Sequence, residues 1–235
     1  DWSSDVLLFR SEEEETEYIQ GLERYIINGE DVSIYPDAPE RYPYHAVLIR
    51  DSNGGYYCGG TLIAPDIVLT AGHCSVPKQV EIGRVTRTHN RGNYERRTVA
   101  YSYRHPRFDN RNFDYDAQLL KLTEPSSKTP VKLNDDPAVP REEWGGYSGV
   151  TVTVTGFGLT SYGGTPSLTL REVDLTSITN QVCEMSSDPT SPSWDYQMGY
   201  KGRIRSSMMC LADRTNSGKD GCTGEFCSAN CCRVF

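Results

Sequence analysis

The chain has 235 residues, of which 37% are hydrophobic and 10% aromatic, so it holds enough apolar material for one large core or two small ones. Its formal net charge is −8, and residues 1–25 carry −6 of that charge because eight acids there face two arginines. No run of 18 apolar residues occurs, so the sequence predicts no membrane span, and no nucleic-acid partner is expected.

Residues 1–25 are predicted to form an acidic leader or propeptide. Residues 12–15 are four consecutive glutamates with few apolar neighbours, which indicates a solvated tail, with an interaction tail as the alternative. The chain starts at Asp1 rather than at a methionine, so a removed or missing N-terminal segment is expected.

Short apolar runs, separated by turn residues about every ten positions, indicate an all-β fold after the leader. Eight cysteines are many for a cytosolic protein of this size, so a secreted, extracellular protein is expected. The cysteines stand at positions 58, 74, 183, 210, 222, 227, 231 and 232.

The segment 58–74, CGGTLIAPDIVLTAGHC, carries the strongest local pattern. Two strand-like pieces, 61–63 and 67–69, flank a Pro-Asp turn, so a hairpin can bring Cys58 and Cys74 together. A bridge that closes about 15 residues contributes roughly 3 kcal/mol of stability by the loop-entropy estimate, and it would hold His73 rigidly. From these residues alone, a structural histidine is the more common interpretation.

The same segment resembles the CGG…TAAHC motif of trypsin/chymotrypsin-like serine proteases, with Gly72 in place of one alanine. Residues 42–49, YPYHAVLI, resemble the first strand of that family. The resemblance implies that His73 is the catalytic base.

A second motif, DYDAQLLKL at 114–122, resembles the DIALLKL motif of the family and implies that Asp116 is the triad carboxylate. A buried carboxylate that accepts the imidazole Nδ1–H fixes the tautomer and stabilises the imidazolium. Asp114 is the competing carboxylate and fits the motif less well.

The resemblance extends from Ile26 to Gly224, which defines a predicted protease domain at 26–224. It includes VTVTGFG at 152–158, where the family has GWG, and it implies a disulfide between Cys183 and Cys210. The implied fold is two antiparallel six-stranded β-barrels at about 26–135 and 145–224, the second incomplete at its C-terminus. It further implies a site in the cleft between the barrels, protein or peptide substrates, protease inhibitors as possible partners, a monomer, and no metal or other cofactor.

Residues 219–224, KDGCTG, resemble the approach to the nucleophile in this family. Asp220 would then be the carboxylate that pairs with an Arg or Lys side chain of the substrate, and Gly224 would belong to the oxyanion hole. Seen without the family, Asp220 is an ordinary loop aspartate.

The resemblance breaks at Glu225 and Phe226, which occupy the Asp and Ser positions of the family's CxGDSGGP motif. Phenylalanine has no nucleophilic atom, and loss of the nucleophile from such a triad costs on the order of 10⁶ in rate. The sequence therefore predicts an inactive chain, either a defective form of an endopeptidase or a pseudoprotease that binds peptides or regulates a protease. Cys227 is the alternative nucleophile, but it stands one residue too far along.

Residues 225–235 are predicted to be a non-homologous, cysteine-rich tail. Gly224-Glu225-Phe226 can be encoded by GGTGAGTTT, which contains the intron donor sequence GTGAGT, so intron read-through is one hypothesis for the tail. The cysteines without an assigned partner would pair irregularly or bind zinc through four thiolates. These are Cys222, Cys227, Cys231 and Cys232.

Activation also departs from the family pattern. Ile26 resembles the new N-terminus that a zymogen gains on cleavage, but Tyr25 stands before it, so the cut follows either an aromatic residue or Arg24.

The segment 84–111 is rich in arginine and contains only two acids, Glu95 and Asp109. A solvated barrel face and a site for polyanions or acidic segments are the two interpretations. The arginines are Arg84, Arg87, Arg91, Arg96, Arg97, Arg104, Arg107 and Arg111.

Overall fold

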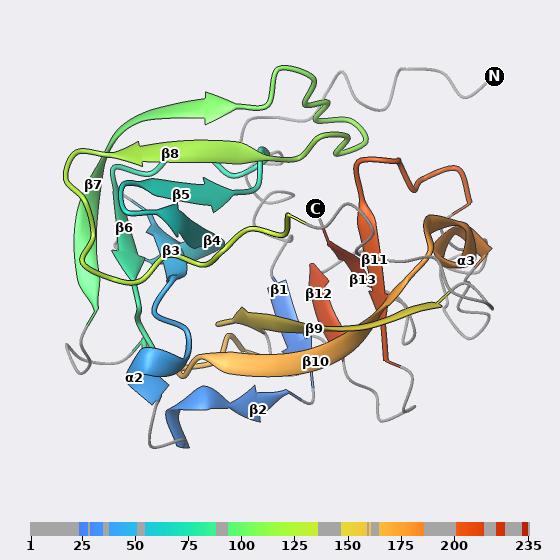
Figure 1. Cartoon of the computed structure of the whole chain (residues 1–235), viewed down its shortest axis with the longest axis horizontal. Helices are drawn as coiled ribbons and strands as arrows, with labels where there is room; N and C mark the ends of the chain where they lie inside the picture. Colours follow the sequence, from blue (N-terminus) through green and yellow to red (C-terminus); the bar gives the residue numbers. More distant parts are fainter. Residues whose placement is uncertain are drawn as a thin grey trace.

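The computed structural model describes residues 24–27, 29–34, 38–50, 55–87, 94–135, 147–158, 160, 165–185, 201–213, 220–223 and 232–234. Most of the predicted leader and of the predicted tail lie outside these ranges. The described part is built mainly of antiparallel strands in two units, with the first unit drawn on the left of Figure 1 and the second on the lower right.

Six strands close the first unit into a barrel in the order β3-β4-β5-β8-β7-β6. The strands are β3 (His45–Ile49), β4 (Tyr56–Ala64), β5 (Ile67–Thr70), β6 (Gln79–Ile82), β7 (Glu95–Arg104) and β8 (Gln118–Leu122). All neighbouring strands are antiparallel. The Pro-Asp turn predicted between two strand-like pieces joins β4 to β5, as the sequence pattern indicates.

The barrel interior is filled by aliphatic side chains, which alternate with outward residues in β5 and β8, whereas all five residues of β3 are buried. In β8, Leu120 and Leu122 are buried, whereas Leu119 is exposed and Lys121, between the two buried leucines, is partly exposed. The residues with no exposed surface are Ala46, Leu48, Leu62, Val68, Val80, Ile82 and Leu120.

The second unit is a five-stranded sheet, open in the described part of the chain, in which β10 (Arg171–Ile178) pairs with β9 (Tyr147–Gly156), β11 (Met209–Ala212) and β2 (Glu30–Asp31). Strand β13 (Cys232–Val234) pairs with the far side of β11. A separate two-stranded ladder joins β1 (Arg24–Ile27) to β12 (Asp220–Thr223). The predicted fold class, two antiparallel barrels of which the second is incomplete, is confirmed.

In the described residues, three short helical segments accompany the strands. They are η2 (Val32–Ile34), α2 (Ala38–Arg41) and α3 (Asn180–Met185). Among the helices described here, none has the length and apolar character that a membrane crossing requires.

The two units share an apolar contact that includes Phe157, the residue that replaces the tryptophan of the family's GWG motif. Val32, Val47, Phe157 and Leu170 form one buried cluster that draws on both units. The Phe157 ring also lies 5.8 Å from the ring of Tyr56 on β4, centroid to centroid. The two units are therefore packed against each other through this apolar cluster.

Candidate active site

His73 lies in a short turn after β5 that is fixed on both sides. The predicted disulfide between Cys58 on β4 and Cys74 is present, with its two Cα atoms 6.4 Å apart. The Cys74 N–H donates to the carbonyl of Ala71 at 3.2 Å, which closes the turn around the histidine. The His73 side chain is 12% exposed, so its ring is held at the surface rather than buried in the barrel core.

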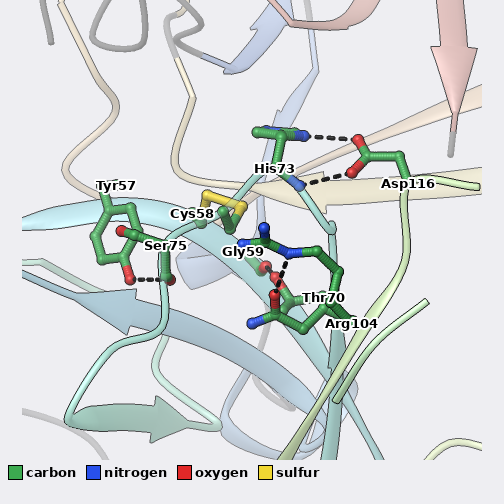
Figure 2. Close-up of a disulfide and its surroundings, with 10 residues drawn as sticks. Tyr57, Cys58, Gly59, Thr70, His73, Ser75, Arg104 and Asp116 are labelled. Carbon is green, nitrogen blue, oxygen red and sulfur yellow. Dashed lines mark hydrogen bonds and ion pairs between the residues drawn. A yellow bond between two sulfur atoms is a disulfide. The ribbon is translucent and has the colours of Figure 1, made fainter. Parts of the chain in front are cut away.

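Asp116, which precedes β8, makes two hydrogen bonds with His73 (Figure 2). Its Oδ2 lies 2.6 Å from the ring Nδ1, and its Oδ1 accepts the backbone N–H of His73 at 2.7 Å. The Asp116 side chain has no exposed surface. Because a carboxylate can only accept here, Nδ1 carries the proton and Nε2 is the basic nitrogen.

This pair is the arrangement that general-base catalysis requires. The carboxylate orients the imidazole, and it stabilises the imidazolium that forms when Nε2 takes a proton. Gly72 adjoins this pair, and a Cβ at that position would lie 3.1 Å from Asp116 Oδ1 and 3.1 Å from the Phe108 ring, a tight contact that small shifts of the neighbours would have to relieve.

The competing carboxylate, Asp114, bonds elsewhere. Its Oδ1 accepts a hydrogen bond from Ser207 Oγ of the second unit at 2.5 Å. The geometry therefore favours Asp116 over Asp114 as the partner of His73.

The turn that contains Asp114 and leads into Asp116 has an unusual backbone. Phe113 and Tyr115 have φ angles of 56° and 53°, in the left-handed region that residues other than glycine rarely adopt. The Phe113 ring meets the His73 ring edge-on with centroids 5.5 Å apart, while the Tyr115 ring is stacked on His105 with centroids 4.7 Å apart. Such strained turns cluster at functional sites.

Some of the other predicted site residues lie in the described part of the chain, and others lie outside it. The predicted disulfide between Cys183 on α3 and Cys210 on β11 is present. Ile26 and Asp220 lie in the β1–β12 ladder, where Ile26 is opposite Gly221. Gly224 and Phe226 lie outside the described residues, and so does the alternative nucleophile Cys227.

One cluster has the composition of a metal site. The side-chain ligand atoms of Cys58, His73 and Cys74 lie within 4.8 Å of one another. Both sulfurs are joined in the disulfide, so they offer no thiolate, and the residues do not fit a zinc ion.

Four arginines of the arginine-rich segment form ion pairs, three lie over aromatic rings, and Arg91 lies outside the described residues. Arg84 and Arg96 pair with Glu81, Arg97 pairs with Glu95, and Arg111 pairs with Asp109. Arg87, Arg104 and Arg107 lie over the rings of Tyr56, Phe108 and Tyr115. These contacts favour the solvated-face interpretation over a site for polyanions.

Sequence reasoning missed Phe113, which contacts His73, and Ser207, which contacts the turn that precedes Asp116. The Phe113 contact depends on a left-handed backbone conformation, and the sequence gives no indication of that conformation at a phenylalanine. Ser207 reaches the site from 92 residues away in the sequence, through a contact that only the packing of the two barrels creates.

Comparison with known proteins adds independent findings. The family model described as Trypsin matches residues 31–226.

Human kallikrein-11 is 32% identical over 218 residues, which cover 87% of this chain and 66% of that protein. A trypsin of Saccharopolyspora erythraea is 27% identical over 206 residues, 85% of this chain and 78% of the relative. Cationic trypsin-3 of Rattus norvegicus is 33% identical over 190 residues, 78% of this chain and 66% of the relative. The chain thus spans about two thirds of the length of kallikrein-11 and of the rat trypsin.

Proposed function

We propose, from the premise that this chain belongs to the trypsin family, that it represents a secreted serine endopeptidase that retains the base and carboxylate of the site but lacks the nucleophile. The observation that carries the proposal is the buried carboxylate of Asp116, 2.6 Å from Nδ1 of His73. Two disulfides in the described part support secretion, because such bridges persist in oxidising compartments.

In the proposed reaction, Nε2 of His73 accepts the proton of an attacking hydroxyl and later returns it to the leaving amine of a cleaved peptide. Asp116 holds the ring and stabilises its positive charge during the transfer. The substrates are proteins or peptides, and protease inhibitors that occupy the same cleft are the proposed partners.

The attacking hydroxyl is the missing part. Aligning Gly221 to Gly224 with the family motif puts Phe226 at the nucleophile position, and a phenyl ring cannot attack a carbonyl carbon. We therefore propose that the chain as given does not hydrolyse peptides, and that a form with the family's Gly-Asp-Ser-Gly-Gly sequence does.

A fluorophosphonate probe, which reacts covalently with an activated serine, tests this proposal. The present chain should remain unlabelled, whereas the protein encoded by a transcript that restores Gly-Asp-Ser-Gly-Gly should be labelled. Labelling of the present chain would refute its inactivity. The absence of labelling in the restored protein, after cleavage directly before Ile26, would refute the endopeptidase assignment.

The alternative function is a non-catalytic homologue that binds peptides or regulates a true protease, and the Glu225-Phe226 pair is the observation that favours it. Sequencing of the mature transcript separates the two functions. A mature message that still encodes Glu-Phe-Cys-Ser supports the non-catalytic protein, and a message that restores the family sequence supports intron read-through.

A further inference from the structure

A single hydroxyl group connects the second unit to the turn that carries the catalytic carboxylate. Ser207 lies just before β11, and the loop between β7 and β8 comes close to this segment at the upper right of Figure 1. Ser207 Oγ is 2.5 Å from Asp114 Oδ1 and 3.0 Å from the backbone nitrogen of Tyr115.

The chemistry of the two partners determines whether Ser207 Oγ donates or accepts in each hydrogen bond. A backbone N–H can only donate, so Ser207 Oγ accepts from Tyr115, and an ionised carboxylate can only accept, so the hydroxyl donates its proton to Asp114. The hydroxyl therefore donates one hydrogen bond and accepts another, and the two bonds together restrict the position of the turn.

The contacted turn needs such support. Phe113 and Tyr115 both lie in the left-handed region, and conformations of this kind persist only where surrounding contacts impose them. On its own side, the turn is held by the Asp114 N–H, which donates to Asn112 Oδ1 at 2.9 Å, and by the Asp109 N–H, which donates to the Asp114 carbonyl at 3.1 Å. Ser207 supplies the support from the opposite unit.

The turn adjoins both members of the catalytic pair. Asp116 directly follows Tyr115, and the Phe113 ring lies edge-on against His73. A shift of the turn therefore moves the carboxylate through the backbone and the imidazole through the ring contact.

Ser207 is itself held firmly by the second unit. The Asn180 side chain at the start of α3 donates Nδ2 to the carbonyls of Arg205 and Met208, each at 3.0 Å. The Met208 N–H donates to the Arg205 carbonyl at 3.0 Å and closes the turn that presents Ser207. Hydrogen bonds and short stretches of backbone thus link α3 to the turn that precedes the catalytic carboxylate.

We propose that Ser207 is a positioning residue. Its hydroxyl, which comes from the second unit, fixes the strained 113–115 turn and thereby keeps the Asp116 carboxylate and the His73 ring at hydrogen-bonding distance from each other. This inference concerns the site named in the proposed function. It does not depend on a nucleophile or on turnover.

Proton NMR of the whole chain tests this role, with the Nδ1–H resonance of His73 as the probe. A proton shared between an imidazole and a buried carboxylate gives a downfield signal that exchanges with water when the pair opens. Ser207→Ala should raise the exchange rate about tenfold or more. It removes a hydrogen bond to a charged group, and the free energy of such a bond corresponds to at least that change in the equilibrium between the closed and the open pair. Ser207→Thr, which keeps the hydroxyl, should restore slow exchange.

Two further variants keep the test decisive. Asp114→Asn retains the size of the side chain but removes the charge, so it should also speed exchange, and it serves if Ser207→Ala does not fold. Ser206→Ala alters the exposed neighbouring serine and should leave the exchange rate unchanged.

A folded Ser207→Ala or Asp114→Asn protein with the wild-type exchange rate would overturn the proposal, even if its melting temperature fell. Equal acceleration by Ser206→Ala would overturn it as well, because the effect would then belong to the segment rather than to the hydroxyl. Failure of the fluorophosphonate experiment would leave these NMR outcomes unaffected.

Discussion

Glu81 is a carboxylate on the outer side of β6 that is only 1% exposed. It is stabilised by three partners, since Tyr56 Oη donates at 2.6 Å, Arg96 Nη2 lies at 2.6 Å and Arg84 Nη1 lies at 3.1 Å. Arg84 is itself only 6% exposed, whereas 52% of the Arg96 side chain is exposed. The two arginines therefore depend on Glu81 to very different degrees.

Glu81→Gln should destabilise the protein by about 3–5 kcal/mol, because it leaves the buried guanidinium of Arg84 without its counter-charge. Arg96→Ala removes the exposed partner and should cost less than about 1 kcal/mol. Urea unfolding of the two variants beside the wild type measures both changes. Equal losses would show that burial of Arg84 does not govern the energetics of this cluster.

Asp220 is the residue that the proposed specificity for Arg and Lys depends on. If its carboxylate lies at the base of a substrate pocket, an aromatic amidine should bind the present chain, because this binding needs no nucleophile. Asp220→Asn should weaken the binding at least tenfold, since it removes the counter-charge of a desolvated cation. Fluorescence titration with an aminobenzamidine measures the change, and equal affinity of both proteins would exclude Asp220 as the specificity residue.

The residues of the site differ in how well sequence alone identifies them. His73 lies in a 17-residue segment, after a strand and next to a cysteine that forms a disulfide, so the nearby sequence is enough to identify it as a site residue. Asp116 follows from the motif that leads into β8. Ser207 lies in no motif, and it becomes a site residue only because the second unit packs against the first.

At the scale of elements, local pattern predicts hairpins well and distant pairings poorly. The two apolar strand-like pieces and the Pro-Asp turn between them are sufficient to predict the hairpin of β4 and β5. The pairing of β1 with β12 joins Ile26 to Gly221, and no local pattern specifies a partner so far away. The helix α3, with six residues, is too short to show helical periodicity.

The two disulfides should contribute similar stability but act differently on the site. Their sequence separations of 16 and 27 residues predict roughly 3 and 3.5 kcal/mol from loop entropy. Replacing Cys58 and Cys74 by serine should therefore lower stability and also speed exchange of the His73 Nδ1 proton, because Cys74 adjoins the histidine.

The matched control replaces Cys183 and Cys210 by serine. This pair should lower stability by a similar amount, with a smaller effect on the histidine proton, because the bridge from α3 to β11 acts on the site only through the Ser207 turn, whereas Cys74 adjoins the histidine. Thermal melts and proton exchange on the same samples separate the two effects. Equal acceleration by both pairs would contradict a specific role of the first bridge at the dyad.

At the scale of the whole molecule, polar contacts accompany the apolar cluster that joins the two units. His45 Nδ1 on β3 lies 3.1 Å from Thr155 Oγ1 on β9. Arg41 on α2 donates two hydrogen bonds to Glu172 on β10, at 2.9 Å and 2.8 Å. Tyr42, next to Arg41, donates to the same carboxylate at 2.5 Å. Glu172 thereby ties the segment that enters the first barrel to the central strand of the second unit.

This contact makes the stability of the assembled molecule depend on pH. The hydrogen bonds from Arg41 lower the pKa of Glu172 below its ordinary value of 4.5, against the opposing effect of burial. A carboxyl group with a lowered pKa in the folded state stabilises the protein above its unfolded-state pKa, and that contribution is lost as pH falls through the folded-state value.

Glu172→Gln should therefore lower the melting temperature by roughly 2–4 °C at neutral pH, a small shift because Arg41 is partly exposed to solvent. The difference from the wild type should stay constant down to about pH 5 and shrink below the ordinary pKa of 4.5, where protonation removes the wild-type advantage. Melting curves across this range measure it, with Glu124→Gln on the exposed loop after β8 as the matched control. A difference that persists unchanged into strong acid would show that the charge of Glu172 does not join the two units, and that the packing of its side chain does.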